Sequence, residues 1–404
     1  MKSRPQSSTI GYIEQVTLLA LISSLIALSI DAMLPALALI EQDLNVIDPN
    51  GRQYVISMLF LGMAVGMLFY GPISDSTGRK GPIYTGFAIF LIGCVLSITA
   101  ENFTVMLIGR FLQGLGAAGP RVVSMALIRD QYSGRHMARF MSLVMTVFIL
   151  VPVLAPGLGQ LILFVADWRA IFVAMAVMAL IAFFWFMIRH PETLEKSKRV
   201  HFSFDRLLLA SKEVVTNRTS LGFTIISGFV FSAFLGYLST SQQIFQDQYG
   251  VGDQFPIYFG ALAIAVGGAS LTNSAMVVRL GMKNLISKAL WAFTILSICF
   301  LLYAISEAGH PPLWVLMIFL FITFFCFGIL FGNLNALAME PLGHIAGVAS
   351  AIITCVSTLQ SVTFGTLVAQ SYDGTILPLV IGFSTFGMIS LILMYFTNSR
   401  SPSD

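Results

Sequence analysis

Charged residues are scarce in this sequence: Asp, Glu, Lys and Arg make up 10% of its 404 residues, against roughly a quarter in a soluble globular protein. With 57% hydrophobic residues and a mean hydropathy of +0.86, the composition excludes a soluble enzyme, a nucleic-acid-binding protein and a disordered scaffold. A membrane-spanning helix with its connection takes about 30 residues, so the chain accommodates roughly 12 to 13 spans. The composition predicts an all-α polytopic membrane protein.

The sequence also lacks the residue patterns of catalytic, metal-binding and nucleotide-binding sites. The four cysteines lie inside apolar runs without CxxC or Cys/His spacing, which predicts packing residues and neither disulfides nor a metal site. The sequence has no Gly-Lys-Ser/Thr phosphate loop, and the segments between spans are too short for an ATPase or another enzyme domain. We therefore expect a protein that is not an enzyme and uses no cofactor, with transport that is passive or driven by an ion gradient.

The apolar runs predict twelve spans, at 15–38, 54–73, 82–100, 103–126, 137–165, 168–188, 220–244, 255–278, 284–306, 312–338, 344–370 and 375–396. Between the sixth and seventh lies the longest polar stretch, 189–219, with seven basic and four acidic residues. We interpret it as a solvated cytoplasmic linker; the alternative is a patch for nucleic acid or lipid headgroups. The predicted domains are a six-helix bundle at 1–188, the linker, and a second six-helix bundle at 220–404. This is a layout of transporters that bind substrate between two halves.

Basic residues in the short loops predict the orientation, because Lys and Arg stay on the cytoplasmic side of a membrane. With the N-terminus inside, 18 of the 22 basic residues are cytoplasmic, and only Arg52 and Arg169 fall in outer loops. Both termini are therefore predicted to be cytoplasmic.

Three stretches resemble the motifs of one transporter family. Residues 71–80 (GPISDSTGRK) resemble the G-x-L-S-D-x-x-G-R-K loop motif of the major facilitator superfamily, and residues 107–116 (LIGRFLQGLG) resemble its fourth-span motif. Residues 31–37 (DAMLPAL) resemble the D-x-x-L-P-A-L signature of the drug:proton antiporters, particularly the bicyclomycin-resistance (Bcr/CflA) group. The resemblance implies a major facilitator fold of twelve transmembrane helices in two six-helix halves, and drug efflux.

The fifth span departs from the antiporter pattern. Residues 151–160 (VPVLAPGLGQ) keep one Pro and one Gly of the motif G-x-x-x-G-P-x-x-G-G but lack its other three glycines. Proline removes a backbone hydrogen bond and glycine lets helices approach closely, so this span is expected to bend. The bend could form a gate or a seal against leak, or only serve ordinary helix packing. The residues concerned are Pro152, Pro156, Gly157 and Gly159.

Two opposite charges lie inside predicted spans at similar depth. Asp31 is about 24 Å from the cytoplasmic start of its helix, and Arg110 is about 10 Å from the outer end of its own. Charges in the bilayer core are rare unless they face a cavity or a partner. We interpret Asp31 as a proton carrier whose affinity for the proton changes with conformation, with Arg110 as its cationic neighbour. The alternative is a static ion pair that holds two helices together. Gln113, one turn from Arg110, is expected to line the substrate cavity.

The loop motif predicts a conformational latch. Asp75 can accept hydrogen bonds at a helix start, Gly78 permits a tight turn, and Arg79 can pair with Asp130 at the cytoplasmic end of the fourth span. The alternative for Arg79 and Lys80 is a simple topological signal.

These features together indicate a transporter of the bacterial inner membrane. The expected activity is proton-coupled efflux of small amphipathic compounds such as antibiotics, by alternating access and powered by the proton gradient. The alternatives are an exporter of one endogenous metabolite, such as a siderophore or amino-acid derivative, and a membrane sensor or assembly factor that transports nothing. The expected partners are a small-molecule substrate and the lipid bilayer, with no nucleic acid, and the protein is expected to be a monomer.

Overall fold

The computed structural model describes residues 11–132 and 134–398, and these residues are helical without a strand. The helices are α1 (Tyr12–Asp31), α2 (Leu37–Asp43), α3 (Tyr54–Thr77), α4 (Lys80–Ile98), α5 (Phe103–Gln131), α6 (Gly134–Leu163), α7 (Arg169–Arg189), α8 (Phe204–Thr216), α9 (Arg218–Gln242), α10 (Phe255–Leu280), α11 (Met282–Ser306), α12 (Leu313–Met339), α13 (Ala346–Gln370) and α14 (Leu377–Asn398). Short helical turns join several of them: η1 (Leu34–Ala36), η2 (Gly51–Gln53), η3 (Lys196–Lys198), η4 (Gln243–Gln248), η5 (Gly252–Gln254) and η6 (Glu340–Ile345).

The all-α membrane fold is confirmed. Ten stretches of the described residues are long and apolar enough to cross a bilayer. One of them, 313–370, contains both α12 and α13 joined by η6, and α6 contributes a shorter apolar stretch at Leu150–Leu163. Eleven of the twelve predicted spans thus correspond to one long helix each, with ends that differ by a few residues, and the first span corresponds to α1, η1 and the start of α2.

The first span differs from the prediction, because the helix does not run unbroken over 15–38. α1 ends at Asp31, and the chain passes through η1 before α2 begins at Leu37. Pro35 lies in η1; proline lacks a backbone N–H and disfavours helical geometry in the residue before it. The break therefore falls directly beside Asp31.

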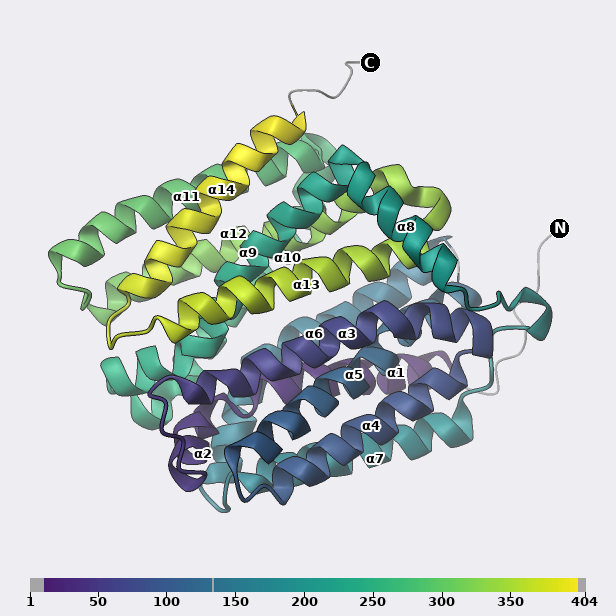
Figure 1. Cartoon of the computed structure of the whole chain (residues 1–404), viewed down its shortest axis with the longest axis horizontal. Coiled ribbons are helices and arrows are strands. Elements are labelled where there is room, and N and C mark those ends of the chain that lie inside the picture. Colours follow the sequence, from purple (N-terminus) through teal and green to yellow (C-terminus); the bar gives the residue numbers. More distant parts are fainter. Residues whose placement is uncertain (1–10, 133, 399–404) are drawn as a thin grey trace.

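The helices form two groups (Figure 1). In the first group, α5 packs against α3 and α4, while α1 packs against α6 and α7. In the second group, α9 packs against α12, α13 and α14, and α11 against α12 and α14. The domain boundaries stay a prediction, but the stretch between the groups is partly ordered, because α8 packs against α9 and α13 through its buried residues Leu207, Ala210 and Val214.

Every long helix joins the same two ends of the molecule, which we call the α2 end and the α8 end after the short helices there. The two groups meet through polar contacts at the α2 end. The Asn50 side chain donates to the Gln370 carbonyl over 3.0 Å, Gln160 donates to Asp253 over 2.9 Å, and Arg52 forms an ion pair with Asp247. Among the described residues, no hydrogen bond or ion pair joins helices of the two groups at the α8 end. This conformation is therefore closed at the α2 end.

Glycines fix the position of α5. A Cβ at Gly114 would lie 1.9 Å from the Leu59 carbonyl oxygen of α3, and one at Gly116 would lie 2.3 Å from the Phe90 nitrogen of α4. Small residues let helix backbones approach this closely in membranes. α5 is therefore locked between α3 and α4, and the rotation that aims Arg110 is set by this packing.

Candidate functional site

Asp31 lies at the C-terminal end of α1, where the two groups meet. Its side chain is buried, with 5% of the residue exposed, and among the described residues it has no hydrogen bond or ion pair. The turn that follows it, η1, packs against α9 of the second group, which carries Tyr237. Tyr237 is fully buried, and its hydroxyl has no hydrogen-bond partner among the described residues. The carboxyl is therefore an isolated polar group at the join between the groups.

Arg110 is fully buried on α5, and its guanidinium is held by neutral oxygens. It donates to the Ser29 carbonyl over 2.7 Å, to the Val55 carbonyl over 3.1 Å and to Gln113 Oε1 over 2.6 Å. This arrangement differs from the alternative of a static Asp31–Arg110 ion pair, because the guanidinium binds the α1 backbone two residues before Asp31 instead of its carboxylate. Helix depth places both residues at one level, as predicted, but not in contact.

Gln113 also differs from its predicted place. It is fully buried, and it donates to Ser97 over 3.1 Å while accepting from Arg110. Both ends of the amide are used between α4 and α5. In this conformation Gln113 positions the Arg110 guanidinium and does not line a solvent-exposed surface.

The glycines and prolines of α6 lie beside Asp31 and along α10. Gly159 faces Ala32, the residue after Asp31, and Gly157 faces Pro256 at the start of α10. Pro152 and Pro156 lie inside α6, which remains one helix from Gly134 to Leu163. The predicted bend stays a prediction. The packing does place this segment between the Asp31 turn and the second group.

The residues of the predicted latch lie together at the α8 end. Arg79 donates to Asp75 over 2.5 Å and to Asp130 over 2.8 Å, so α3 and α5 are joined at the start of α4. Gly78 has a φ of 106°, a backbone conformation that favours glycine. Lys80 is more peripheral, with its ammonium 5.7 Å from the centre of the Tyr84 ring.

Sequence reasoning missed the part that the linker contributes to this cluster. Glu192 accepts hydrogen bonds from the backbone N–H groups of Arg79 and Lys80, at 2.9 and 3.1 Å, and Thr193 donates its hydroxyl to Asp130 over 3.1 Å. Burial acts to raise the pKa of Glu192, but hydrogen bonds from the backbones of Arg79, Leu194, Lys80 and Thr193 outweigh it and hold that pKa below its ordinary value. The available signal was an acidic residue within a basic linker.

A second arginine inside a span, Arg121 of α5, also escaped sequence reasoning. Its side chain is exposed to solvent, and among the described residues it has no hydrogen bond or ion pair. The sequence did contain a signal for Arg121, because a charged residue inside a membrane span indicates a functional position.

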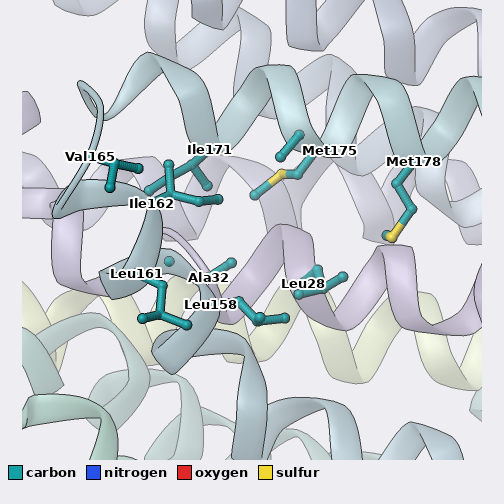
Figure 2. A pocket seen from close by; sticks show the side chains of 11 residues that line it. Leu28, Ala32, Leu158, Leu161, Ile162, Val165, Ile171, Met175 and Met178 are labelled. Carbon is teal, nitrogen blue, oxygen red and sulfur yellow. The ribbon is translucent and has the colours of Figure 1, made fainter.

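An apolar pocket of about 370 Å³ lies between α1, α6 and α7, near Asp31 (Figure 2). Its lining has no charged or amide side chain, and Leu161 and Val165 at its rim are 60% and 86% exposed. An apolar hollow with such a rim suits a lipid chain and offers nothing to orient a polar substrate. The lining residues are Leu28, Ala32, Leu158, Gly159, Leu161, Ile162, Val165, Ile171, Ala174, Met175 and Met178.

Comparison with known proteins places this geometry in a family. Residues 19–365 match the model of the Major Facilitator Superfamily. The chain belongs to the major facilitator superfamily. It is 30% identical over 395 residues to a bicyclomycin resistance protein homolog of Haemophilus influenzae, covering 95% of this chain and 96% of that protein. It is also 30% identical to the multidrug resistance protein MdtL of Escherichia coli strain Crooks, covering 92% and 93%.

A solved major facilitator structure has the same fold. The crystal structure of a D-xylose-proton symporter superposes with a TM-score of 0.75 over 97% of this chain and 98% of that one, at 14% identity. The resemblance found in residues 31–37, 71–80 and 107–116 is thus confirmed: this chain is a major facilitator transporter with relatives named for drug resistance.

Proposed function

We propose that this transporter exports small amphipathic compounds in exchange for protons, by alternating access in the bacterial inner membrane. In this proposal both termini are cytoplasmic, so the α8 end faces the cytoplasm and the α2 end faces outward. The proton gradient supplies the energy without a bound cofactor, and one chain is the working unit. Relatives named for bicyclomycin and multidrug resistance support the substrate class.

The observation that carries the proton coupling is the isolated burial of Asp31 at the join of the two groups. An ionised carboxylate without a partner is unfavourable in a medium of low polarity. Separation of the groups at the α2 end would admit water to Asp31, and closure would remove it again. Movement between the two conformations therefore changes how strongly the carboxyl holds a proton, which is what an antiporter requires.

The polar contacts between the groups suit such a movement. Opening the α2 end would break the Arg52–Asp247 ion pair and the hydrogen bonds of Asn50 and Gln160 across the join. These contacts have exposed or partly exposed members and can exchange for water at modest cost. The Arg79 cluster at the α8 end lies within the first group and its linker, so we assign it the role of a latch that holds α3, α4 and α5 together as one body during the movement.

The test is proton-coupled transport by the purified protein. Proteoliposomes loaded with a pH-sensitive dye are given antibiotics of unrelated structure, and proton movement is recorded for wild type, Asp31→Asn and the surface control Asp205→Asn. We expect compound-dependent proton movement in wild type and in the control, and none in Asp31→Asn. Full coupling in Asp31→Asn would contradict the assigned proton site. A response to one compound only would favour a dedicated metabolite exporter over a multidrug exporter.

A further inference from the structure

Arg121 lies inside the membrane span formed by α5, and its side chain is exposed to solvent. A charge inside a span is rare unless it faces a water-filled cavity or a partner, so we expect the guanidinium to face water between the helices. It has no hydrogen bond or ion pair to another described residue, whereas the deeper Arg110 makes three hydrogen bonds. Arginine remains protonated in proteins, so Arg121 is a cation without a counter-charge from the described chain.

The packing of α5 shows where Arg121 points. One flank of the helix is covered by α3, through Phe111 and Leu115, and the opposite flank by α4, through Gly116 and Gly119. Arg121 follows Arg110 by eleven residues, which is close to three full turns, so both lie on one face about 16 Å apart along the axis. Arg110 on that face contacts α1 two residues before Asp31. Arg121 therefore projects from the same face of α5 as Arg110, on neither the α3 nor the α4 flank and nearer the α8 end.

The interior charges do not balance at this position. Asp31 is the acidic residue well inside a span, and it lies near the α2 end, some three turns from the level of Arg121. Asp130, nearer in sequence, is held by Arg79 and Thr193. A cation in such an enclosed space attracts an anion from solution, since the low polarity of the surroundings strengthens the attraction.

An apolar surface lies at a matching depth on the second group. Phe331 and Arg121 each follow the start of their helices at the α2 end by eighteen residues, or about 27 Å of helix. The Phe331 ring is half-buried and lies 5.5 Å from each of the half-buried rings of Phe231 and Phe234. Phe231 in turn meets Phe60 of the first group at 5.9 Å, so the aromatic cluster crosses the join.

We propose that Arg121 binds an anionic group of the transported molecule, and that the substrates include amphipathic carboxylates whose apolar part lies against this aromatic cluster. The planar guanidinium fork matches a carboxylate with two parallel hydrogen bonds. A carboxylate carries one negative charge, which the single positive charge of Arg121 neutralises. A phosphate group with two negative charges would be neutralised only in part. The inference rests on the proposed transport function and adds a substrate class to it.

The experiment measures binding to the purified full-length protein by titration calorimetry, with two probes of the same shape. Naphthaleneacetate carries a carboxylate, and naphthaleneacetamide is its neutral counterpart. The variants are Arg121→Gln, Arg121→Lys and the control Arg129→Gln, since Arg129 is an exposed arginine two turns further along α5. Thermal unfolding checks that each variant is folded.

We expect wild type and Arg129→Gln to bind the carboxylate about tenfold or more tightly than the amide. Arg121→Gln should bind both probes equally, with unchanged affinity for the amide. Arg121→Lys keeps the charge but lacks the fork, so an intermediate preference is expected, and this variant carries the test if Arg121→Gln does not fold. If Arg121→Gln bound the carboxylate more tightly than the amide by the same factor as wild type, the proposal would be overturned.

Equal or absent binding of both probes by wild type would also overturn it. Such a result would leave the proposed transport function untouched. That function is tested separately, by proton movement with neutral and cationic antibiotics. A protein that couples those compounds to protons but ignores the carboxylate would keep its proposed function and lose this substrate class.

Discussion

Gly159 of α6 lies against the backbone of Ala32, so closely that a Cβ at Gly159 would be 1.8 Å from the Ala32 carbonyl oxygen. Ala32 follows Asp31 at the break between α1 and α2. α6 also packs against α10 of the second group. A displacement of α6 relative to α1 is therefore transmitted directly to the turn that carries the proposed proton carrier.

Gly159→Ala should disturb this contact. Overpacking of this kind typically costs about 1 to 3 kcal/mol, so we expect a lower unfolding temperature and weaker proton coupling. Gly157→Ala is the matched control, because its added methyl would meet only Pro256 at 4.0 Å, an ordinary contact. Thermal unfolding in detergent and proton movement in proteoliposomes measure the two effects. Equal behaviour of the two variants would contradict a tight α1–α6 contact.

Arg110→Ala should destabilise the protein, and Asp31→Ala should not rescue it. Removal of the guanidinium leaves the Ser29 carbonyl at the end of α1 and the Gln113 amide oxygen without their donor, at about 1 to 3 kcal/mol for each buried group. Asp31 is not the partner of Arg110 in this structure, so its removal restores nothing. Unfolding temperatures of the two single variants and the double variant make a mutant cycle. Recovery of stability in the double variant would show that the ion pair forms after all.

Glu192 should make the α8 end sensitive to acid. Its pKa in the folded protein lies below the ordinary value of 4.5, so the carboxylate stabilises the fold above about pH 4.5, and this contribution is lost as the pH falls further. As the pH falls from about 5 to about 3, the unfolding temperature of wild type should fall more than that of Glu192→Gln. Glu195→Gln is the control, since Glu195 is exposed and forms an ion pair with Lys198 on the surface. Parallel curves for wild type and Glu192→Gln would contradict the assigned role.

The orientation can be tested by labelling single cysteines in intact cells. Lys198 and Lys283 are exposed at the α8 end, and Asp48 is exposed at the α2 end. Cysteines at the first two positions should react only from the cytoplasm, and one at Asp48 only from outside, because the basic loops gather at the α8 end. Reaction of position 198 with an impermeant reagent added outside would reverse the proposed orientation.

Composition and local motifs predict the helices, and the fixed length of a membrane span predicts which helix ends meet on one side, as in the Arg79 cluster. Arg79, for example, is joined to Asp130 as residues 71–80 predicted. Counting along a helix also gave the common level of Asp31 and Arg110. It could not give the rotation of each helix, which is set by packing such as Gly114 against Leu59.

This missing rotation explains the differences at the candidate site. Gln113 faces α4 and Arg110 faces the α1 backbone, although the two residues are only one turn apart on α5. Glu192 binds the start of α4 from more than a hundred residues away in sequence, and no local pattern records such a contact.

The segment between the groups has a mechanical consequence. The Val200 N–H donates to the Asp75 carbonyl over 3.0 Å, which ties this point of the chain to the first group, and α8 begins at Phe204 and packs on the second. Only residues 201–203 connect the two anchors, and a chain of this length reaches about 14 Å when fully extended. The connection therefore acts as a tether that limits how far the two groups can part at the α8 end while both anchors hold.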